Sequence, residues 1–198
     1  MTRRVVVAML VPVSWSPPGV DLRAWRSAMA EDVVDLLARL AQAEAAIAAV
    51  PADRELAEEI AWPGTRIYEI PAPTVLPVLA AAAEDGFDQA AVIAADAPDV
   101  PGMTLGKLLR PLDSKAVAVA PGGPGGGLFG VATGLPAPGW LVDHDLDSAS
   151  AQLLRKTAPV PGDVTSTPHW RRLRGPAELA TLDVALEGWE NTRALLGG

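Results

Sequence analysis

Hydrophobic runs and turns alternate along the chain in an order that predicts strands followed by helices. The nine apolar residues 5–13 form a run suited to a strand that is buried on both faces. Asp21 is then a candidate helix N-cap, and apolar residues recur every three or four positions from Leu22 to Leu40. This spacing predicts an amphipathic helix. Further strands are predicted at 45–50, 66–70, 90–95, 116–120 and 128–133.

Helices are predicted between these strands and after them. A short helix or turn covers 52–60, a helix over 74–85 ends at Gly86, and another covers 104–112. The rest of the chain predicts a short strand at 140–142, a helix at 148–156 and a last helix at 176–196. We therefore expect an α/β fold, a three-layer sandwich with a mostly parallel central sheet, formed by residues 1–198 as a single domain.

Composition excludes several classes of protein. The chain of 198 residues has no cysteine, which rules out disulfides, thiol catalysis and cysteine metal sites, and 49% of its residues are hydrophobic, as in a globular protein. The formal charge of −8 disfavours a nucleic acid partner. The abundance of Ala, Gly, Pro and Arg is typical of a bacterial protein.

The N-terminus resembles a signal peptide, because Arg3 and Arg4 precede the apolar run. The turn Ser14–Gly19 that follows is not a small-residue cleavage site, so we favour a buried strand. No apolar run approaches the ~20 residues of a membrane span. We expect a cytoplasmic protein with no membrane partner.

Charge is unevenly distributed along the sequence. Residues 27–154 carry 18 acidic and 6 basic side chains, whereas 155–174 carry 5 basic side chains and 1 acidic one. Within the basic segment, His169 and Trp170 precede Arg171, Arg172 and Arg174. Two interpretations remain open, a patch that binds an anion or a basic face that balances the acidic middle.

Asp96 and Asp99 are the strongest candidates for chemistry. They follow the predicted strand 90–95, and ligands of open parallel sheets bind at the carboxyl ends of the strands. Mg²⁺ prefers oxygen ligands and is often held by one or two carboxylates. The alternative is that either residue caps the next helix or closes a turn.

Two other loops carry weaker signals. The glycine-rich segment 121–127 predicts either a phosphate-binding loop or a hairpin connection, and it is not a P-loop, because a strand and not a helix follows it. The cluster Asp143–Asp147 contains one histidine, and we interpret it as a solvated loop that caps the next helix. Trp15, in the loop after the first strand, is placed to stack on a base.

The order of these elements, with Ala91–Pro101 around the Asp96 turn and Pro121 before paired glycines, resembles the nucleotide-diphospho-sugar transferase superfamily with its GT-A-like, nucleotidyltransferase-like fold. Within it, the chain is similar to the DUF2064 proteins, relatives of the molybdenum-cofactor and phospholactate guanylyltransferases. The segment Trp140–Thr157 and the stretch Pro176–Leu179 extend the resemblance over most of the chain.

The resemblance implies a nucleotide or sugar nucleotide above the sheet, with Mg²⁺ bound at Asp96. Asp99 would be a second catalytic residue. Arg23 or Arg26 would then lie near the phosphates, and Trp15, Gly125 and Gly126 would contact the ligand.

The sequence departs from the family pattern at three places. The loop 14–20 has no cation, the acid expected before the paired glycines is replaced by Pro124 or Gly125, and acidic positions near the C-terminus hold Arg172 and Arg174. Loss of carboxylates and cations removes the groups that stabilise charge during transfer.

Two hypotheses follow from this incomplete set. The first is a Mg²⁺-dependent nucleotidyltransferase or glycosyltransferase, and the second is a non-catalytic nucleotide-binding or assembly module on the same fold. The apolar helix faces also allow a homodimer, although a one-domain core uses the same residues.

Overall fold

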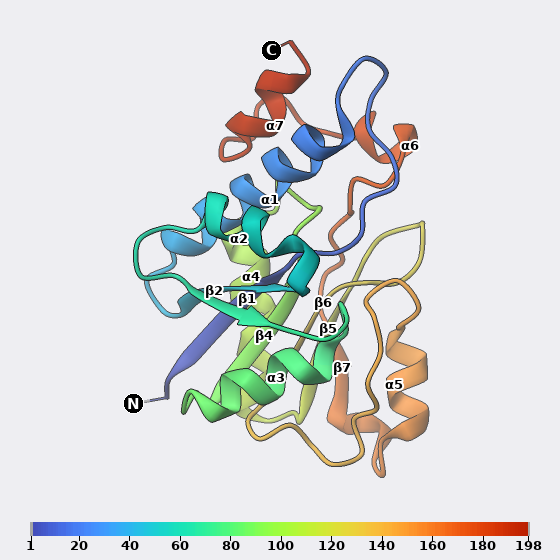
Figure 1. The fold of residues 1–198 in the computed structure, drawn as a ribbon. Coiled ribbons are helices and arrows are strands. Elements are labelled where there is room, and N and C mark those ends of the chain that lie inside the picture. The colour runs from blue at the N-terminus through green and yellow to red at the C-terminus, as the bar shows by residue number, and fades with distance from the viewer. Residues whose placement is uncertain (1, 198) are drawn as a thin grey trace.

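The computed structural model, which describes residues 2–197, contains one seven-stranded sheet (Figure 1). Its order is β3-β2-β1-β4-β6-β5-β7. Only β6 among these strands is antiparallel to its neighbours, which confirms the expected mostly parallel sheet. The strands are β1 (Arg4–Met9), β2 (Glu44–Ala49), β3 (Arg66–Glu69), β4 (Gln89–Ala94), β5 (Val117–Pro121), β6 (Leu128–Gly134) and β7 (Val164–Ser166).

Helices cover both faces of the sheet and form the outer layers of a sandwich. One face packs against α1 (Leu22–Ala38), α2 (Arg54–Ile60) and α4 (Gly102–Leu109). The other face packs against α3 (Val75–Glu84) and α5 (Ala151–Thr157). Short 3₁₀ turns are η1 (Pro51–Asp53), η2 (Arg110–Asp113) and η3 (Pro161–Asp163). No helix among residues 2–197 is long and apolar enough to cross a membrane.

Local sequence explains where the longest helix begins. The Asp21 side chain accepts a hydrogen bond from the backbone N–H of Ala24 at 2.9 Å, as expected of an N-cap. Val33, Val34 and Leu37 then face the sheet and are at most 1% exposed. The apolar spacing in the sequence therefore predicted both the start and the buried face of α1.

The C-terminal region differs from the sequence prediction. In place of one helix over 176–196, the chain forms α6 (Pro176–Leu179) and α7 (Glu190–Leu195), which are separated by turns. Residues 140–142 form no strand, and β7 was not predicted. A strand of three residues at the sheet edge has too little apolar pattern to be recognised.

Asp32 of α1 holds this C-terminal region in place. Its carboxylate accepts hydrogen bonds from the backbone N–H groups of Asn191 and Thr192, at 3.0 and 2.8 Å. Burial raises the pKa of Asp32, and these hydrogen bonds oppose the rise. In Figure 1, α6 and α7 lie above the carboxyl ends of the central strands, beside the loop that leads into α1.

The contact between β4 and β6 provides a test of the sheet. A Cβ added at Gly130 of β6 would lie 2.8 Å from Ile93 Cγ2 and 3.0 Å from the carbonyl oxygen of Val92. We expect Gly130→Ala to lower the free energy of unfolding by about 1–3 kcal/mol, because the added methyl overpacks the sheet. Chemical denaturation measures this change.

The matched control is Gly134→Ala at the end of the same strand, where a Cβ meets no atom within 4 Å. Its unfolding midpoint should stay close to that of the wild type. Equal midpoints for the two variants would contradict the tight packing of β4 on β6.

Candidate functional site

The Asp96 turn lies at the carboxyl end of β4, next to the end of β1, as the sequence predicted. The side chain of Asp96 is nevertheless not open to a ligand, because the residue is only 1% exposed. Its backbone carbonyl accepts a hydrogen bond from the N–H of Leu173 at 2.7 Å. The C-terminal segment therefore covers the turn that was expected to stand open.

A guanidinium occupies the place expected for a metal ion. Arg172 Nε donates to Asp96 Oδ1 at 2.7 Å, and Arg172 Nη2 donates to Asp96 Oδ2 at 2.9 Å. Nη1 donates to Asp147 Oδ1 at 2.5 Å. The Arg172 side chain is 0% exposed. The negative charges of Asp96 and Asp147 compensate the cost of burying its positive charge.

Electrostatics keep Arg172 charged in this position. Burial alone lowers the pKa of the guanidinium, but the charges and hydrogen bonds of Asp96 and Asp147 outweigh burial and raise it above its usual value. Arginine also matches a carboxylate with two parallel hydrogen bonds, a geometry that lysine does not offer.

Mg²⁺ does not fit at Asp96 in this arrangement. Both carboxylate oxygens already accept hydrogen bonds from Arg172, and a divalent cation at the same oxygens would lie against the guanidinium charge. Within residues 2–197, no cluster of three or more potential acidic or histidine ligands has the geometry of a metal site. The prediction of an open metal ligand at Asp96 is corrected accordingly.

Asp99 forms a second ion pair of the same kind. Its carboxylate is paired with Arg171 and accepts a hydrogen bond from Trp170 Nε1 at 3.2 Å. Burial raises the pKa of Asp99, and Arg171 opposes that rise. Neither Asp96 nor Asp99 caps α4, whose N-cap residue is Pro101, so the alternative of a capping role does not hold either.

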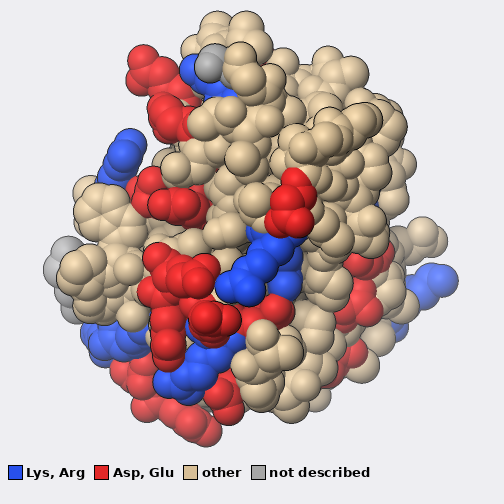
Figure 2. All heavy atoms as spheres, turned by 45° about the horizontal axis from the view of Figure 1, so that its top comes forward, with Lys and Arg blue, Asp and Glu red and all other residues tan. Residues whose placement is uncertain are grey.

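The basic run thus pairs with aspartates along its whole length. Arg174 completes the series, since its Nη1 donates to Asp147 at 3.0 Å. Of the two interpretations of this run, the structure matches the one in which it balances the acidic middle of the chain. Figure 2 shows the same trend, because most basic side chains on the face that it displays lie against acidic ones.

The two arginines predicted to lie near phosphates are also paired within the chain. Arg26 donates to both carboxylate oxygens of Asp53, at 2.7 and 2.6 Å, and to the backbone carbonyl of Val11. Arg23 is exposed and lies 3.5 Å from Glu55 and Glu59. Neither side chain forms a hydrogen bond or an ion pair with Asp96.

Aromatic and apolar side chains from the loop after β1, from α1 and from the C-terminal segment pack together. Trp15 packs edge-on against Trp25, with ring centroids 6.2 Å apart, instead of presenting a face to a ligand. Trp25, Met29 and Leu173 are all 0% exposed and form a small separate core. Trp15, which was expected to stack on a base, is therefore in contact with the chain's own aromatic residue.

The glycine-rich loop is a hairpin connection. It joins β5 to the antiparallel β6, and the N–H of Gly122 donates to the carbonyl of Gly127 at 3.0 Å. A Cβ at Gly127 would lie 2.6 Å from the carbonyl oxygen of Leu146, which explains the glycine there. Gly126 accepts a hydrogen bond from Arg174, and Gly125 lies next to that side chain.

The Asp143–Asp147 cluster also has structural partners. Asp143 accepts hydrogen bonds from the backbone N–H of Leu76 and the hydroxyl of Thr74, at the start of α3. Asp145 accepts from the N–H groups of Asp147 and Ser148. The cap of the next helix, α5, is Ser150, so the cluster caps α3 instead of the helix that was predicted.

Two hollows remain at the carboxyl edge of the sheet. One, of 550 Å³, is lined by Trp170, Arg171 and Glu178 among others, and one, of 450 Å³, lies between Val11 and Asp147. Asp96 lines neither of them. Open space therefore exists near the predicted site, but the Asp96 carboxylate does not line it.

Comparison with known proteins supports the fold. A protein from Desulfovibrio desulfuricans described as a nucleotide-diphospho-sugar transferase shares 17% identity, with a TM-score of 0.65 over 100% of this chain and 98% of that one. The 4-diphosphocytidyl-2C-methyl-D-erythritol synthase of Anaerococcus prevotii is 9% identical, with a TM-score of 0.62 over 98% and 96%. These similarities define the class: the chain has the nucleotide-diphospho-sugar transferase fold.

A third similar structure contains a metal. It is the Mycobacterium tuberculosis protein Rv0371c in complex with manganese, which is 15% identical, with a TM-score of 0.52 over 100% of this chain and 99% of that one. No protein family model matches the sequence, and no curated protein matches it. The closer likeness to DUF2064 and the two guanylyltransferases stays a prediction.

The Asp96–Arg172 pair leads to a stability prediction. We expect Arg172→Met to lower the free energy of unfolding by about 3–5 kcal/mol, because it leaves a buried carboxylate without a partner. Replacing both partners, in Asp96→Asn with Arg172→Met, should recover part of this loss. Urea denaturation of the single and double variants measures both effects.

The control is Arg174→Met, which removes a more exposed arginine from the same segment and from the same Asp147. Arg174→Met should lower the free energy of unfolding by about 1 kcal/mol or less. An Arg172→Met variant as stable as Arg174→Met would show that the buried pair does not carry this stability.

Proposed function

We propose that this chain is a non-catalytic binding or assembly module built on the nucleotide-diphospho-sugar transferase fold. The observation that carries the proposal is the contact of Arg172 with both carboxylate oxygens of Asp96. Nucleotidyl transfer needs cations that neutralise charge as the attacking and leaving groups exchange. In this chain the cation at Asp96 is the Arg172 side chain, which donates to both carboxylate oxygens.

Packing above β1 supports the same proposal. The apolar cluster around Trp25 and Leu173 lies at the carboxyl edge, where open α/β sheets bind their ligands. Arg23 and Arg26 are engaged with carboxylates of α2 and the η1 turn. A nucleotide phosphate bound at Asp96 itself would have to displace Arg172, and neither hollow at this edge is lined by Asp96.

The second candidate function is a Mg²⁺-dependent transferase in which Asp96 and Asp99 become catalytic only after the covering segment moves. A specific observation favours keeping it. The residues 167–175 that cover Asp96 form neither helix nor strand, and the second partner of Arg172, Asp147, has a 53% exposed side chain. A nucleotide or sugar nucleotide is the partner under this candidate.

A thermal-shift experiment separates the two candidates. The wild-type protein is heated with CTP, GTP or UDP-glucose, each with and without Mg²⁺ or Mn²⁺. A ligand at 100 times its dissociation constant stabilises a protein by about 2.7 kcal/mol, which shifts the melting temperature measurably. We expect no metal-dependent shift with any of the nucleotides.

Rv0371c of Mycobacterium tuberculosis, whose structure holds manganese, is a suitable comparison protein for the metal response. A metal-dependent nucleotide shift in this chain that is lost in Asp96→Asn would overturn the proposal and support the transferase candidate. Arg174→Met should leave such a shift in place, and so it controls for general effects of substitution.

A further inference from the structure

One of the two hollows at the carboxyl edge of the sheet is large enough for a small molecule. Its volume of 550 Å³ falls within the range of roughly 300–1,000 Å³ that is typical of ligand pockets. Its walls come from the β5–β6 hairpin, from residues 169–171 of the crossing segment, and from α6 with the turn after it. This α6 hollow is not lined by Asp96, so the Asp96–Arg172 pair does not fill it.

Apolar surfaces make up part of the wall of the α6 hollow. Pro124 of the hairpin, Trp170 and Ala177 of α6 all line it. Trp170 is held in position, because its backbone N–H donates to the carbonyl of Pro121 at 3.0 Å and its Nε1 donates to Asp99 at 3.2 Å. A side chain that is already held loses little freedom on binding, so this wall can contact the flat apolar body of a ligand.

Glu178 of α6 brings to this hollow a carboxylate without a partner. Within residues 2–197 its side chain forms no hydrogen bond and no ion pair, whereas its backbone carbonyl accepts the hydrogen bonds of Thr181. A Cβ added at Gly125 or Gly175 would lie 3.7 or 3.2 Å from one of its carboxylate oxygens. The carboxylate therefore lies between the glycine-rich loop and the start of α6, free to accept hydrogen bonds from a ligand.

Charge around the α6 hollow favours a cation. The arginine in its wall, Arg171, is paired with Asp99, and the three arginines within 171–174 are matched in number by three aspartates. The charge of Glu178 is left without compensation. Burial raises the pKa of Asp99 and the negative charge of Asp183 adds to that rise, so a further carboxylate acts on the same region. The net charge of −8 also attracts cations to the protein.

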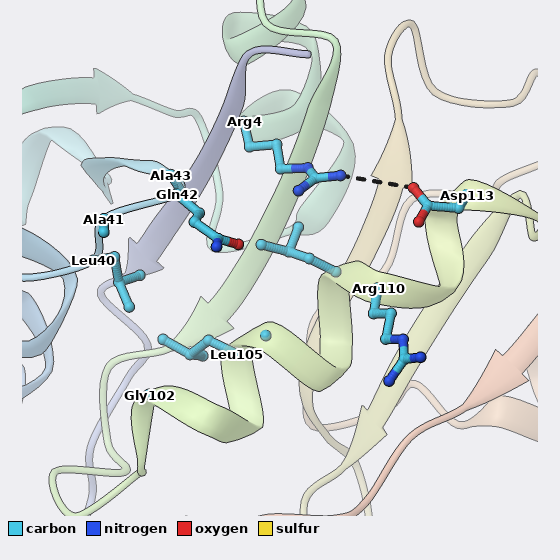
Figure 3. Close-up of a pocket in the computed structure, with 11 residues that line it drawn as sticks. Arg4, Leu40, Ala41, Gln42, Ala43, Gly102, Leu105, Arg110 and Asp113 are labelled. Carbon is cyan, nitrogen blue, oxygen red and sulfur yellow. Dashed lines mark ion pairs between the residues drawn. The ribbon is translucent and has the colours of Figure 1, made fainter. Parts of the chain in front are cut away.

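A second pocket, of 460 Å³ on the flank of the sandwich, has no comparable group (Figure 3). Its Arg4 donates to Gln89 at 2.7 Å and lies 3.7 Å from Asp113. The guanidinium of Arg110 points away from Arg4 and from the cavity in Figure 3. An unpaired charge at the wall therefore distinguishes the α6 hollow from the flank pocket.

We propose that the α6 hollow binds a protonated organic amine with a flat apolar body, such as an arylalkylamine. The ammonium group would donate to the Glu178 carboxylate and to the hydroxyl oxygen of Thr181, and the body would contact Trp170 and Pro124. An anionic ligand would meet the uncompensated carboxylate, which disfavours it. The inference rests on the proposed function, because it names the ligand class of the binding module.

The test compares two molecules that differ in one charged group. Tryptamine carries an ammonium group at neutral pH, and tryptophol has an uncharged hydroxyl on the same indole-ethyl body. In isothermal titration calorimetry we expect saturable binding of tryptamine to the wild type, about three- to fivefold tighter than that of tryptophol, as for a partly exposed ion pair. Absence of tryptamine binding, or equal affinity for the two molecules, would overturn the proposal.

The role of the carboxylate is tested by Glu178→Gln, which keeps the shape of the side chain and removes its charge. It should weaken tryptamine binding by about three- to fivefold and leave tryptophol binding unchanged. Glu187→Gln removes a carboxylate of the same C-terminal region that does not line the hollow, and it should affect neither molecule. Equal effects of the two variants on tryptamine would contradict the assignment of Glu178.

The place of binding is tested by Ala177→Leu, which fills part of the hollow and should weaken both molecules at least about threefold. Ala180→Leu alters an equally exposed alanine that does not line the hollow, and it should bind both as the wild type does. Unchanged tryptamine binding in Ala177→Leu would place the amine elsewhere and overturn the proposal. Both alanines are exposed, so the melting temperatures of the two variants should stay close to that of the wild type.

Failure of this inference differs from failure of the proposed function. A protein that binds no tryptamine and shows no metal-dependent shift with nucleotides would overturn the amine site alone. A metal-dependent nucleotide shift that is lost in Asp96→Asn would instead overturn the non-catalytic function.

Discussion

The structure at the carboxyl edge of the sheet depends on one buried ion pair. A carboxylate placed just after a central strand is costly to bury, and it must either face solvent, bind a cation or receive hydrogen bonds. In this chain Arg172 supplies both the cation and the hydrogen bonds to Asp96. Because the arginine comes from the C-terminal segment, that segment must cross the edge of the sheet to reach Asp96.

Several other features follow from this crossing. Leu173 comes directly after Arg172 and enters the small core with Trp25. Arg171 comes directly before Arg172 and pairs with Asp99. The sequence 171–174 therefore places three basic side chains and one apolar side chain at the carboxyl edge of the sheet. Around Asp96 the observed contacts are those of a packed layer, and the two hollows at this edge are lined by other residues.

Much of the fold could be predicted from the sequence, because the patterns that indicate its strands and helices depend on neighbouring residues. The valine-rich run of β1 and the Asp21 cap of α1 each depend on neighbouring residues alone. The C-terminal region could not be predicted in this way. Its position is set by contacts over more than 150 residues, such as those between Asp32 and Thr192, and short segments held by such contacts carry no periodic pattern.

The sequence predicted the position of Asp96 in the fold but not its environment. Asp96 does follow a central strand, but no local pattern shows which side chain comes to lie against it. The sequence contained one relevant signal: Arg172 and Arg174 occupy positions where acidic residues were expected, and the basic run is matched in number by Asp96, Asp99 and Asp147. A cluster of bases that follows a cluster of acids can indicate pairing within the chain as well as binding of an anion.

The most direct test of this account is the NMR signal of the Arg172 Nε–H group, assigned by its loss in Arg172→Met. A guanidinium held on a buried carboxylate should give a slowly exchanging Nε–H signal that shifts in Asp96→Asn and stays sharp when Mn²⁺ and CTP are added. Paramagnetic broadening of that signal by Mn²⁺ in the presence of CTP would place a metal beside Asp96. Such a result would contradict the assignment of Arg172 as the cation of this site.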